Sequence, residues 1–129
     1  MGKRYLLDSN TIIEYIAGFY PEKSKQWINQ IIDNEINVSV ITKIEVLSFD
    51  PAKDDNYSIL IDFFETSTIF KLDDEIVSKT IQIRQKQKIK LPDALIASTA
   101  LINGLVLVTR NTKDFKNIPD LIFVNPYEI

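Results

Sequence analysis

The chain has 129 residues, the length of a single domain, with 45% hydrophobic and 26% charged residues, as in soluble globular proteins. It contains no cysteine, which excludes disulfides, thiol nucleophiles, zinc–thiolate sites and iron–sulfur clusters. It also contains no histidine, which excludes a Ser-His-Asp triad and imidazole metal ligands. Any catalysis must therefore use carboxylates, hydroxyls, amides, lysine, arginine or tyrosine. A bound metal would have oxygen ligands, which suit Mg²⁺, Mn²⁺ or Ca²⁺.

The net charge of −3 and the pI of about 4.9 speak weakly against a nucleic-acid-binding protein, which is more often basic. The positive charge is nevertheless unevenly distributed, because no acidic residue lies between Glu75 and Asp93. That stretch contains five basic residues: Lys79, Arg84, Lys86, Lys88 and Lys90.

The composition also bears on where the protein works. The lack of cysteine fits a reducing cytoplasm. Residues 1–10 have no long apolar run, so we expect no signal peptide. Residues 94–109 carry no charge, but Asn103-Gly104 interrupts them, so a buried helix followed by a buried strand fits better than a membrane span. We expect a cytoplasmic protein with no membrane partner.

In chain order, the apolar pattern alternates short strands with helices. Strands are predicted over residues 4–7, 36–41, 67–72, 105–108 and 122–124. Six helices are predicted. The first covers 11–17 with Asn10 as N-cap, the second begins with Pro21 at its first position, and the third covers 42–47. The fourth runs from a cap at Asp54 or Asp55 to about 64, the fifth from the Asp73 cap to about 87, and the sixth covers 93–102.

This alternation predicts an α/β fold with three layers, in which helices cover both faces of a central parallel sheet of about four to five strands. The polar stretch 48–56 is too short to separate domains, so residues 1–129 are predicted to form one domain.

Polar residues cluster in sequence where predicted strands end. Asp8 follows the first strand, Glu45 lies one helical turn after the second, and Asp93 begins a buried helix. After the 105–108 strand come Thr109, Arg110, Asn111 and Asp114. In open α/β sheets ligands bind at the carboxyl ends of the strands, so these residues form a candidate site.

Each residue has an alternative interpretation. Asp8 and Asn10 are also suitable helix caps, Asp93 also complements a helix N-terminus, Glu45 also suits a solvated helix face, and Asp114 also suits the cap of a short turn. Together, however, several converging carboxylates would repel one another without a cation. A divalent metal would convert that repulsion into coordination.

Four segments in order resemble the PIN-domain nucleases, with the closest likeness to toxin ribonucleases of the VapC type. These segments are YLLDSNTIIEYI (residues 5–16), ITKIEVLSF (41–49), LPDALIASTA (91–100) and LVTRNTKDF (107–115). The resemblance covers almost the whole chain and all four acidic positions are present. The departures are the 50–56 loop and the acidic overall charge, which bear on partners rather than on catalysis.

The resemblance implies that Asp8, Glu45, Asp93 and Asp114 are catalytic, and that Asp8, Asp93 and Asp114 bind Mg²⁺ or Mn²⁺. Asn10, Thr109 and Asn111 would be supporting polar groups. It also implies an RNA substrate, products with a 5′-phosphate and a 3′-hydroxyl, a protein antitoxin and a homodimer.

Further residues are candidates for binding partners. Arg84, Lys86 and Arg110 are candidate contacts to the RNA backbone, although a solvated helix face is the commoner role of such a charge run. Four aromatic residues are candidates for an antitoxin-binding groove or for ordinary core packing: Tyr15, Phe19, Tyr20 and Trp27.

Other functions remain compatible with the sequence. They are a PIN-type RNA-processing nuclease without antitoxin, a non-catalytic binding module on the same fold, and a phosphoacceptor receiver domain. The last would need a central strand-end aspartate and a lysine after the last strand, and only Asp8 and Asp114 are comparable here, which speaks against it.

Overall fold

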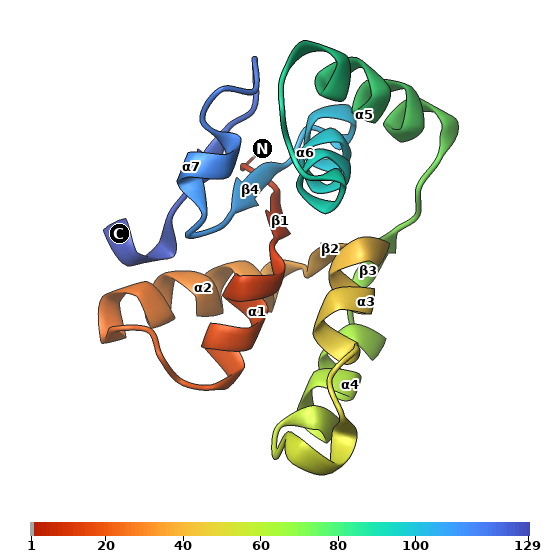
Figure 1. Cartoon of the computed structure of the whole chain (residues 1–129). Coiled ribbons are helices and arrows are strands. Elements are labelled where there is room, and N and C mark those ends of the chain that lie inside the picture. Colours follow the sequence, from red (N-terminus) through yellow and green to blue (C-terminus); the bar gives the residue numbers. More distant parts are fainter. Residues whose placement is uncertain (1) are drawn as a thin grey trace.

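The computed structural model describes residues 2–129. Within them, five strands alternate with seven α-helices and two short 3₁₀ turns (Figure 1). The elements are β1 Tyr5–Leu7, α1 Ser9–Ile16, α2 Glu22–Asn34, β2 Asn37–Ser39, α3 Val40–Leu47, the turn Pro51–Lys53, α4 Tyr57–Glu65, β3 Thr68–Phe70, α5 Asp74–Lys86, α6 Leu91–Asn103, β4 Val106–Val108, α7 Thr112–Phe115, β5 Phe123–Val124 and the turn Pro126–Glu128.

All strand pairs are parallel, as predicted, but the hydrogen-bonded ladders form two groups. One group has the order β1-β4-β5, with Leu6 opposite Leu107, and the other pairs β2 with β3. The two groups lie side by side along β1 and β2. The Asn37 side chain joins them, because its Nδ2 donates to the Tyr5 carbonyl at 3.0 Å. The predicted parallel arrangement is confirmed, and its division into two groups is a finding that the strand pattern did not indicate.

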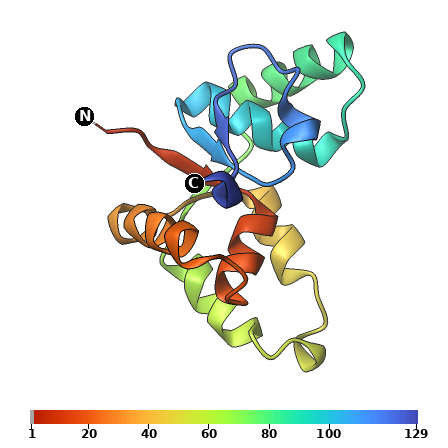
Figure 2. The ribbon, with the colours of Figure 1, turned by 90° about the vertical axis from the view of Figure 1, so that its left-hand side faces the viewer.

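The core lies on both faces of the strands. Leu6 and Leu107 face one side, where they pack against α5, α6 and α7 through residues such as Ile96 and Phe115. Their neighbours in sequence, Leu7 and Val108, face the opposite side and pack against α1 to α4. Because successive strand residues point to opposite faces, two adjacent leucines in β1 anchor both helical layers. Figures 1 and 2 show these layers on the two sides of the strands.

Several predicted element ends need correction. The first helix begins at Ser9 rather than at residue 11, with Asp8 instead of Asn10 as N-cap. Pro21 occupies the N-cap of α2 rather than its first position. Helix α4 is preceded by Asn56, while Asp54 Oδ1 accepts the Asn56 N–H at 2.9 Å in the loop before it. A short polar side chain can satisfy backbone groups in either a loop or a helix start, so the pattern alone does not fix the cap.

Two helix ends agree with their predicted caps. Asp73 Oδ1 accepts the Ile76 N–H at 2.9 Å and starts α5. Gly104 ends α6 in the left-handed conformation, with φ of 64°. No helix within residues 2–129 is both long enough and apolar enough to cross a bilayer.

Candidate active site at the carboxyl edge of the sheet

Asp8 lies at the end of β1 and is almost fully buried, with 5% of its surface exposed. Its backbone N–H donates to the Val108 carbonyl at 3.1 Å, which continues the β1–β4 pairing by one step. Its Oδ1 accepts the Ser9 N–H at 2.8 Å, and its Oδ2 accepts the Thr109 hydroxyl at 2.8 Å and the Asn10 Nδ2 at 3.1 Å. Both carboxylate oxygens are therefore held in fixed positions.

The Asp8 carboxyl has a raised pKa. Burial is the main cause, and the negative charge of Glu45 adds to it. The hydrogen bonds from Thr109, Ser9 and Asn10 act in the opposite direction, because they favour the charged form. Burial thus destabilises the charged form of Asp8, while three hydrogen-bond donors stabilise it.

Glu45 lies on α3, and its carboxylate is exposed. The hydroxyl of Ser9 donates to Glu45 Oε1 at 2.8 Å, and the backbone of the same Ser9 donates to Asp8. Ser9 therefore links two predicted site residues that are 37 positions apart. Sequence reasoning missed Ser9, although it directly follows Asp8 in the first motif.

Asp93 lies in the first turn of α6 and is partly buried. Burial, followed by the charges of Asp114, Asp8 and Glu45, raises its pKa to about 6, whereas Lys90 lowers it. The charges of the other three predicted acids therefore all act on Asp93.

Two adjoining cavities contain these acids. Asp8, Glu45 and Asp93 line a cavity of about 240 Å³ together with Asn10 and Arg110. Asp93 also lines a second cavity, of about 500 Å³, and this one contains Asp114. The structure thus brings three acids into one cavity and places the fourth in its neighbour. Within residues 2–129, no three acidic side chains lie close enough to enclose a metal ion by themselves.

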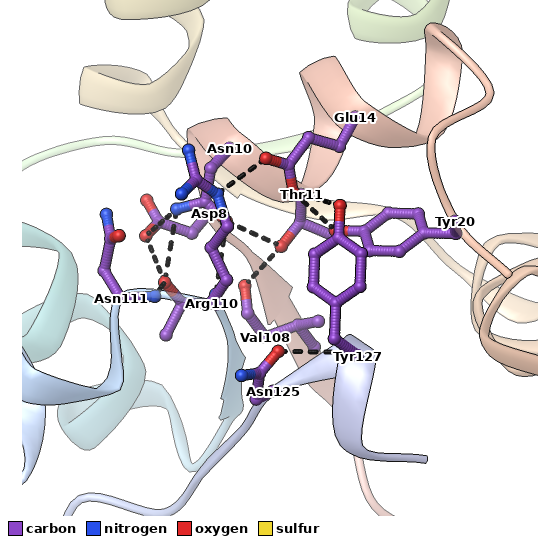
Figure 3. Close-up of polar contacts among 11 residues, drawn as sticks. Asp8, Asn10, Thr11, Glu14, Tyr20, Val108, Arg110, Asn111, Asn125 and Tyr127 are labelled. Atoms are coloured by element: carbon purple, nitrogen blue, oxygen red, sulfur yellow. Dashed lines mark hydrogen bonds and ion pairs between the residues drawn. The ribbon is translucent and has the colours of Figure 1, made fainter.

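Of the three predicted supporting residues, Asn10 and Thr109 hydrogen-bond Asp8 directly, and Asn111 is connected to it through Thr109. Thr109 donates to Asp8, and its hydroxyl oxygen in turn accepts the Asn111 N–H at 3.0 Å and the Asn10 Nδ2 at 3.3 Å. Asn10 Oδ1 accepts the Arg110 N–H at 3.3 Å. Figure 3 shows how these groups connect the start of α1 to the loop that follows β4.

The three predicted RNA contacts lie in different places. Arg110 lines the cavity of Asp8, and Arg84 lines the cavity of Asp93 and Asp114. The Arg84 Nε donates to the Ile89 carbonyl at 3.3 Å, which ties α5 to the loop before α6. Lys86 lines another cavity beside Lys79 and Asn117, which contains none of the four predicted acids.

Three of the four aromatic residues take part in separate contacts, and the fourth is exposed. Trp27 packs edge-on against Tyr5, with the ring centroids 5.6 Å apart, and the buried Tyr20 packs against Tyr127, with the ring centroids 4.7 Å apart. Tyr15 hydrogen-bonds Asn29, and Phe19 is 68% exposed.

Glu14 is a second residue that sequence reasoning missed. It lines the Asp8 cavity, and its Oε2 forms an ion pair with the Arg110 Nε at 2.6 Å. Its position, four residues after Asn10 on α1, is a signal that could have found it, because residues four apart share one face of a helix.

The donor chemistry of the cavity fits a hard divalent cation. The candidate ligands are the carboxylates of Asp8, Asp93 and Asp114, all oxygen donors of the kind that Mg²⁺ and Mn²⁺ prefer. Mg²⁺ commonly keeps several waters and uses one or two protein carboxylates, so three enclosing acids are not required. The repulsion that raises the pKa of Asp93 is the kind that a cation would relieve.

Fold and site together define a three-layer α/β/α domain whose acidic cavity lies at the carboxyl edge of a parallel sheet. The chain belongs to the PIN domain family, which matches residues 5–121. This confirms the family that the four sequence motifs indicate.

Solved structures of similar chains extend the comparison. One, in a toxin–antitoxin complex from Klebsiella pneumoniae, is 32% identical, with 97% of this chain and 99% of that chain covered and a TM-score of 0.75. Another, in DNA-bound VapBC from Salmonella typhimurium, is 26% identical, with the same coverage and a TM-score of 0.81. A third, in VapBC-1 from nontypeable Haemophilus influenzae, is 26% identical, covers 95% and 97%, and has a TM-score of 0.73. The search of curated proteins produced no match.

Proposed function

We propose that this protein is a metal-dependent endoribonuclease that hydrolyses RNA phosphodiester bonds, and that it acts in the cytoplasm as the toxin of a type II toxin–antitoxin pair. The observation that carries the proposal is the shared cavity of Asp8, Glu45 and Asp93, which lie between β1 and α1, on α3 and on α6, respectively. The PIN family and the toxin–antitoxin complexes among the similar structures support the same assignment.

Asp8 and Asp93 would hold Mg²⁺ or Mn²⁺, with Asp114 contributing from the neighbouring cavity. When bound, such an ion lowers the pKa of a coordinated water and neutralises charge on the scissile phosphate. Thr109, Ser9 and Asn10 fix the Asp8 oxygens before anything binds, which limits reorganisation during the reaction. Glu45 is the exposed acid of the three in the cavity and orients the attacking water or accepts its proton.

Basic side chains beside the acids would bind the RNA backbone. Arg84, Lys88, Lys90 and Lys113 line the cavity of Asp93 and Asp114. Within residues 2–129, the ion pairs join Arg4 to Glu35 and Arg110 to Glu14, so these four basic groups have no carboxylate partner. In a chain with a net charge of −3, unpaired cations gathered at one cavity favour a polyanionic substrate.

Protein partners are part of the proposal. Several large apolar side chains are exposed, among them Ile44 and Phe49 near α3 and Val77 and Ile81 on α5. Exposed apolar groups of this size are typical of surfaces that bind another protein. They support an antitoxin and a homodimer as partners.

A single-turnover cleavage assay on a pool of cellular RNAs tests the proposal. With Mg²⁺ or Mn²⁺ we expect cleavage, and with EDTA we expect none. Asp8→Asn and Asp93→Asn should each reduce the rate by at least about 100-fold, which is about 2.7 kcal/mol of activation free energy. Asp62→Asn is the matched control, because Asp62 is exposed on α4 and lines neither cavity. Cleavage that survives EDTA, or an Asp93→Asn variant as active as the wild type, would overturn the metal-nuclease proposal and favour a binding module.

A further inference from the structure

Arg110 is the one basic side chain among the described residues that line the Asp8–Glu45–Asp93 cavity. Its backbone is fixed by Asn10 and its side chain is half exposed, so its guanidinium lies at the mouth of the cavity rather than in the core. The nitrogen closest to Glu14 is Nε, at 2.6 Å. The two terminal nitrogens of a guanidinium are the fork that binds a phosphate through paired contacts.

Glu14, the ion-pair partner of Arg110, is largely shielded from solvent. Its side chain is only 12% exposed, although it pairs with a half-exposed partner. While Oε2 faces Arg110, Oε1 accepts the hydroxyl of Tyr127 at 3.1 Å and that of Tyr20 at 3.3 Å. Figure 3 shows Glu14 between the guanidinium on one side and the two tyrosines on the other.

The two tyrosines come from distant parts of the chain. Tyr20 precedes α2, and Tyr127 belongs to the C-terminal turn Pro126–Glu128, where Asn125 Oδ1 accepts the Tyr127 N–H at 3.0 Å. Their rings pack together at 4.7 Å. Burial raises the pKa of both hydroxyls, so they remain protonated donors at neutral pH. The C-terminal turn is thus connected to the cavity through one carboxylate.

We propose that Glu14 is a positioning residue that holds Arg110 ready to bind a substrate phosphate, and that Tyr127 brings the C-terminal turn into the RNA site by orienting Glu14. This inference rests on the proposed ribonuclease function. A single ion pair with a half-exposed partner contributes little to stability, whereas a long side chain that is already ordered loses less freedom when it binds.

Substitution of Glu14 by glutamine separates this role from two simpler alternatives, because each of the three predicts a different change in KM. If Glu14 is only a negative charge close to the RNA, its removal weakens repulsion and lowers KM. If it only ties α1 to the loop after β4, its removal lowers the melting temperature and leaves KM unchanged. If it positions Arg110, its removal raises KM even though the site has become less negative.

The experiment measures KM and kcat for RNA cleavage together with the melting temperature of each variant. We expect Glu14→Gln to raise KM about fivefold and Tyr127→Phe about twofold, with kcat within about twofold of the wild type. Tyr127→Phe keeps every charge, so its effect cannot come from repulsion. In an Arg110→Ala background, both substitutions should cause no further change in KM, because Glu14 and Tyr127 act through Arg110.

Matched controls come from the same chain. Glu35→Gln breaks the ion pair with Arg4, 2.7 Å long and away from the acidic cavities. Tyr57→Phe removes a hydroxyl that donates to the Leu47 carbonyl. Both should leave KM unchanged.

An unchanged or lower KM in Glu14→Gln, or the same increase in the Arg110→Ala background, would overturn the positioning role while leaving the ribonuclease proposal intact. A wild-type protein that neither cleaves nor binds RNA would instead overturn the ribonuclease proposal, and this inference with it.

Discussion

Replacement of Asp93 by asparagine should stabilise the metal-free protein while it abolishes RNA cleavage. Asp93 is partly buried, and the charges of Asp114, Asp8 and Glu45 all oppose its ionisation. Asparagine has nearly the same size and shape but no charge. The substitution therefore removes the repulsion with little change in packing.

The magnitude follows from the pKa of Asp93, which rises from 3.8 to about 6. At 1.36 kcal/mol per pKa unit, a rise of this size corresponds to about 3 kcal/mol of destabilisation when the carboxyl is charged. Because Asp93 is partly exposed, solvent screening reduces this to about 1–2 kcal/mol. For a domain of this size, the melting temperature should then rise by about 4–8 °C.

The effect has a defined pH dependence. A carboxyl with a raised pKa binds its proton more tightly in the folded state, so its ionisation reduces the stability of the wild type as the pH rises from 3.8 to about 6. The difference in unfolding free energy between Asp93→Asn and the wild type should therefore be small near pH 4, grow up to about pH 6 and stay constant above it.

Urea unfolding in EDTA between pH 4 and 8 measures this difference, with Asp62→Asn as the control for the loss of an exposed charge. The control should change stability by less than about 0.5 kcal/mol. Adding Mg²⁺ should stabilise the wild type by about 2.7 kcal/mol at a concentration 100 times its Kd, and the variant by much less. An Asp93→Asn protein that is less stable than the wild type in EDTA at pH 7 would refute the reasoning.

Three further predictions concern stability and assembly. Asp8→Asn should change the metal-free melting temperature far less than Asp93→Asn. The new amide must turn its NH₂ group toward one of the three donors that now hydrogen-bond the Asp8 carboxylate, and the hydrogen bond lost in this way offsets the relief of charge repulsion. A rise in melting temperature equal to that of Asp93→Asn would contradict this. Gly104→Ala should cost about 1–2 kcal/mol of unfolding free energy in urea, because φ of 64° disfavours a residue with a Cβ; an unchanged midpoint would contradict it. Light scattering should give a dimer mass, and the 14.9 kDa of a monomer at high micromolar concentration would exclude the homodimer.

The sequence predicted the elements that depend on local chemistry. Alternating apolar and polar side chains identified β2, an aspartate before an apolar stripe identified the start of α5, and Asn103-Gly104 identified the end of α6. Each of these signals involves only a few neighbouring residues. Over that range, backbone geometry determines which face of a helix or strand each residue occupies and where the element starts or ends.

The rest depends on contacts between distant residues. The hydrogen bond from Ser9 to Glu45 and the ion pair between Glu14 and Arg110 form only once the chain has folded. The placement of Asp114 in a neighbouring cavity likewise depends on how α7 packs against α6, for which residue spacing contains no information. Serine and glutamate are also common on helix surfaces, so neither stood out beside the aspartates.

The division of the sheet has a consequence for the dynamics of the molecule. β1, β4 and β5 form one ladder, β2 and β3 form another, and the Asn37 amide bridges them. Units of this kind commonly open as separate foldons with different free energies, and amide hydrogen exchange resolves them. Asp8 ends a strand of the first ladder, whereas Glu45 lies on the helix that directly follows the second. We therefore expect that opening between the two ladders moves Asp8 away from Glu45. Such a subglobal fluctuation would disrupt the candidate active site while most backbone amides remain protected from hydrogen exchange.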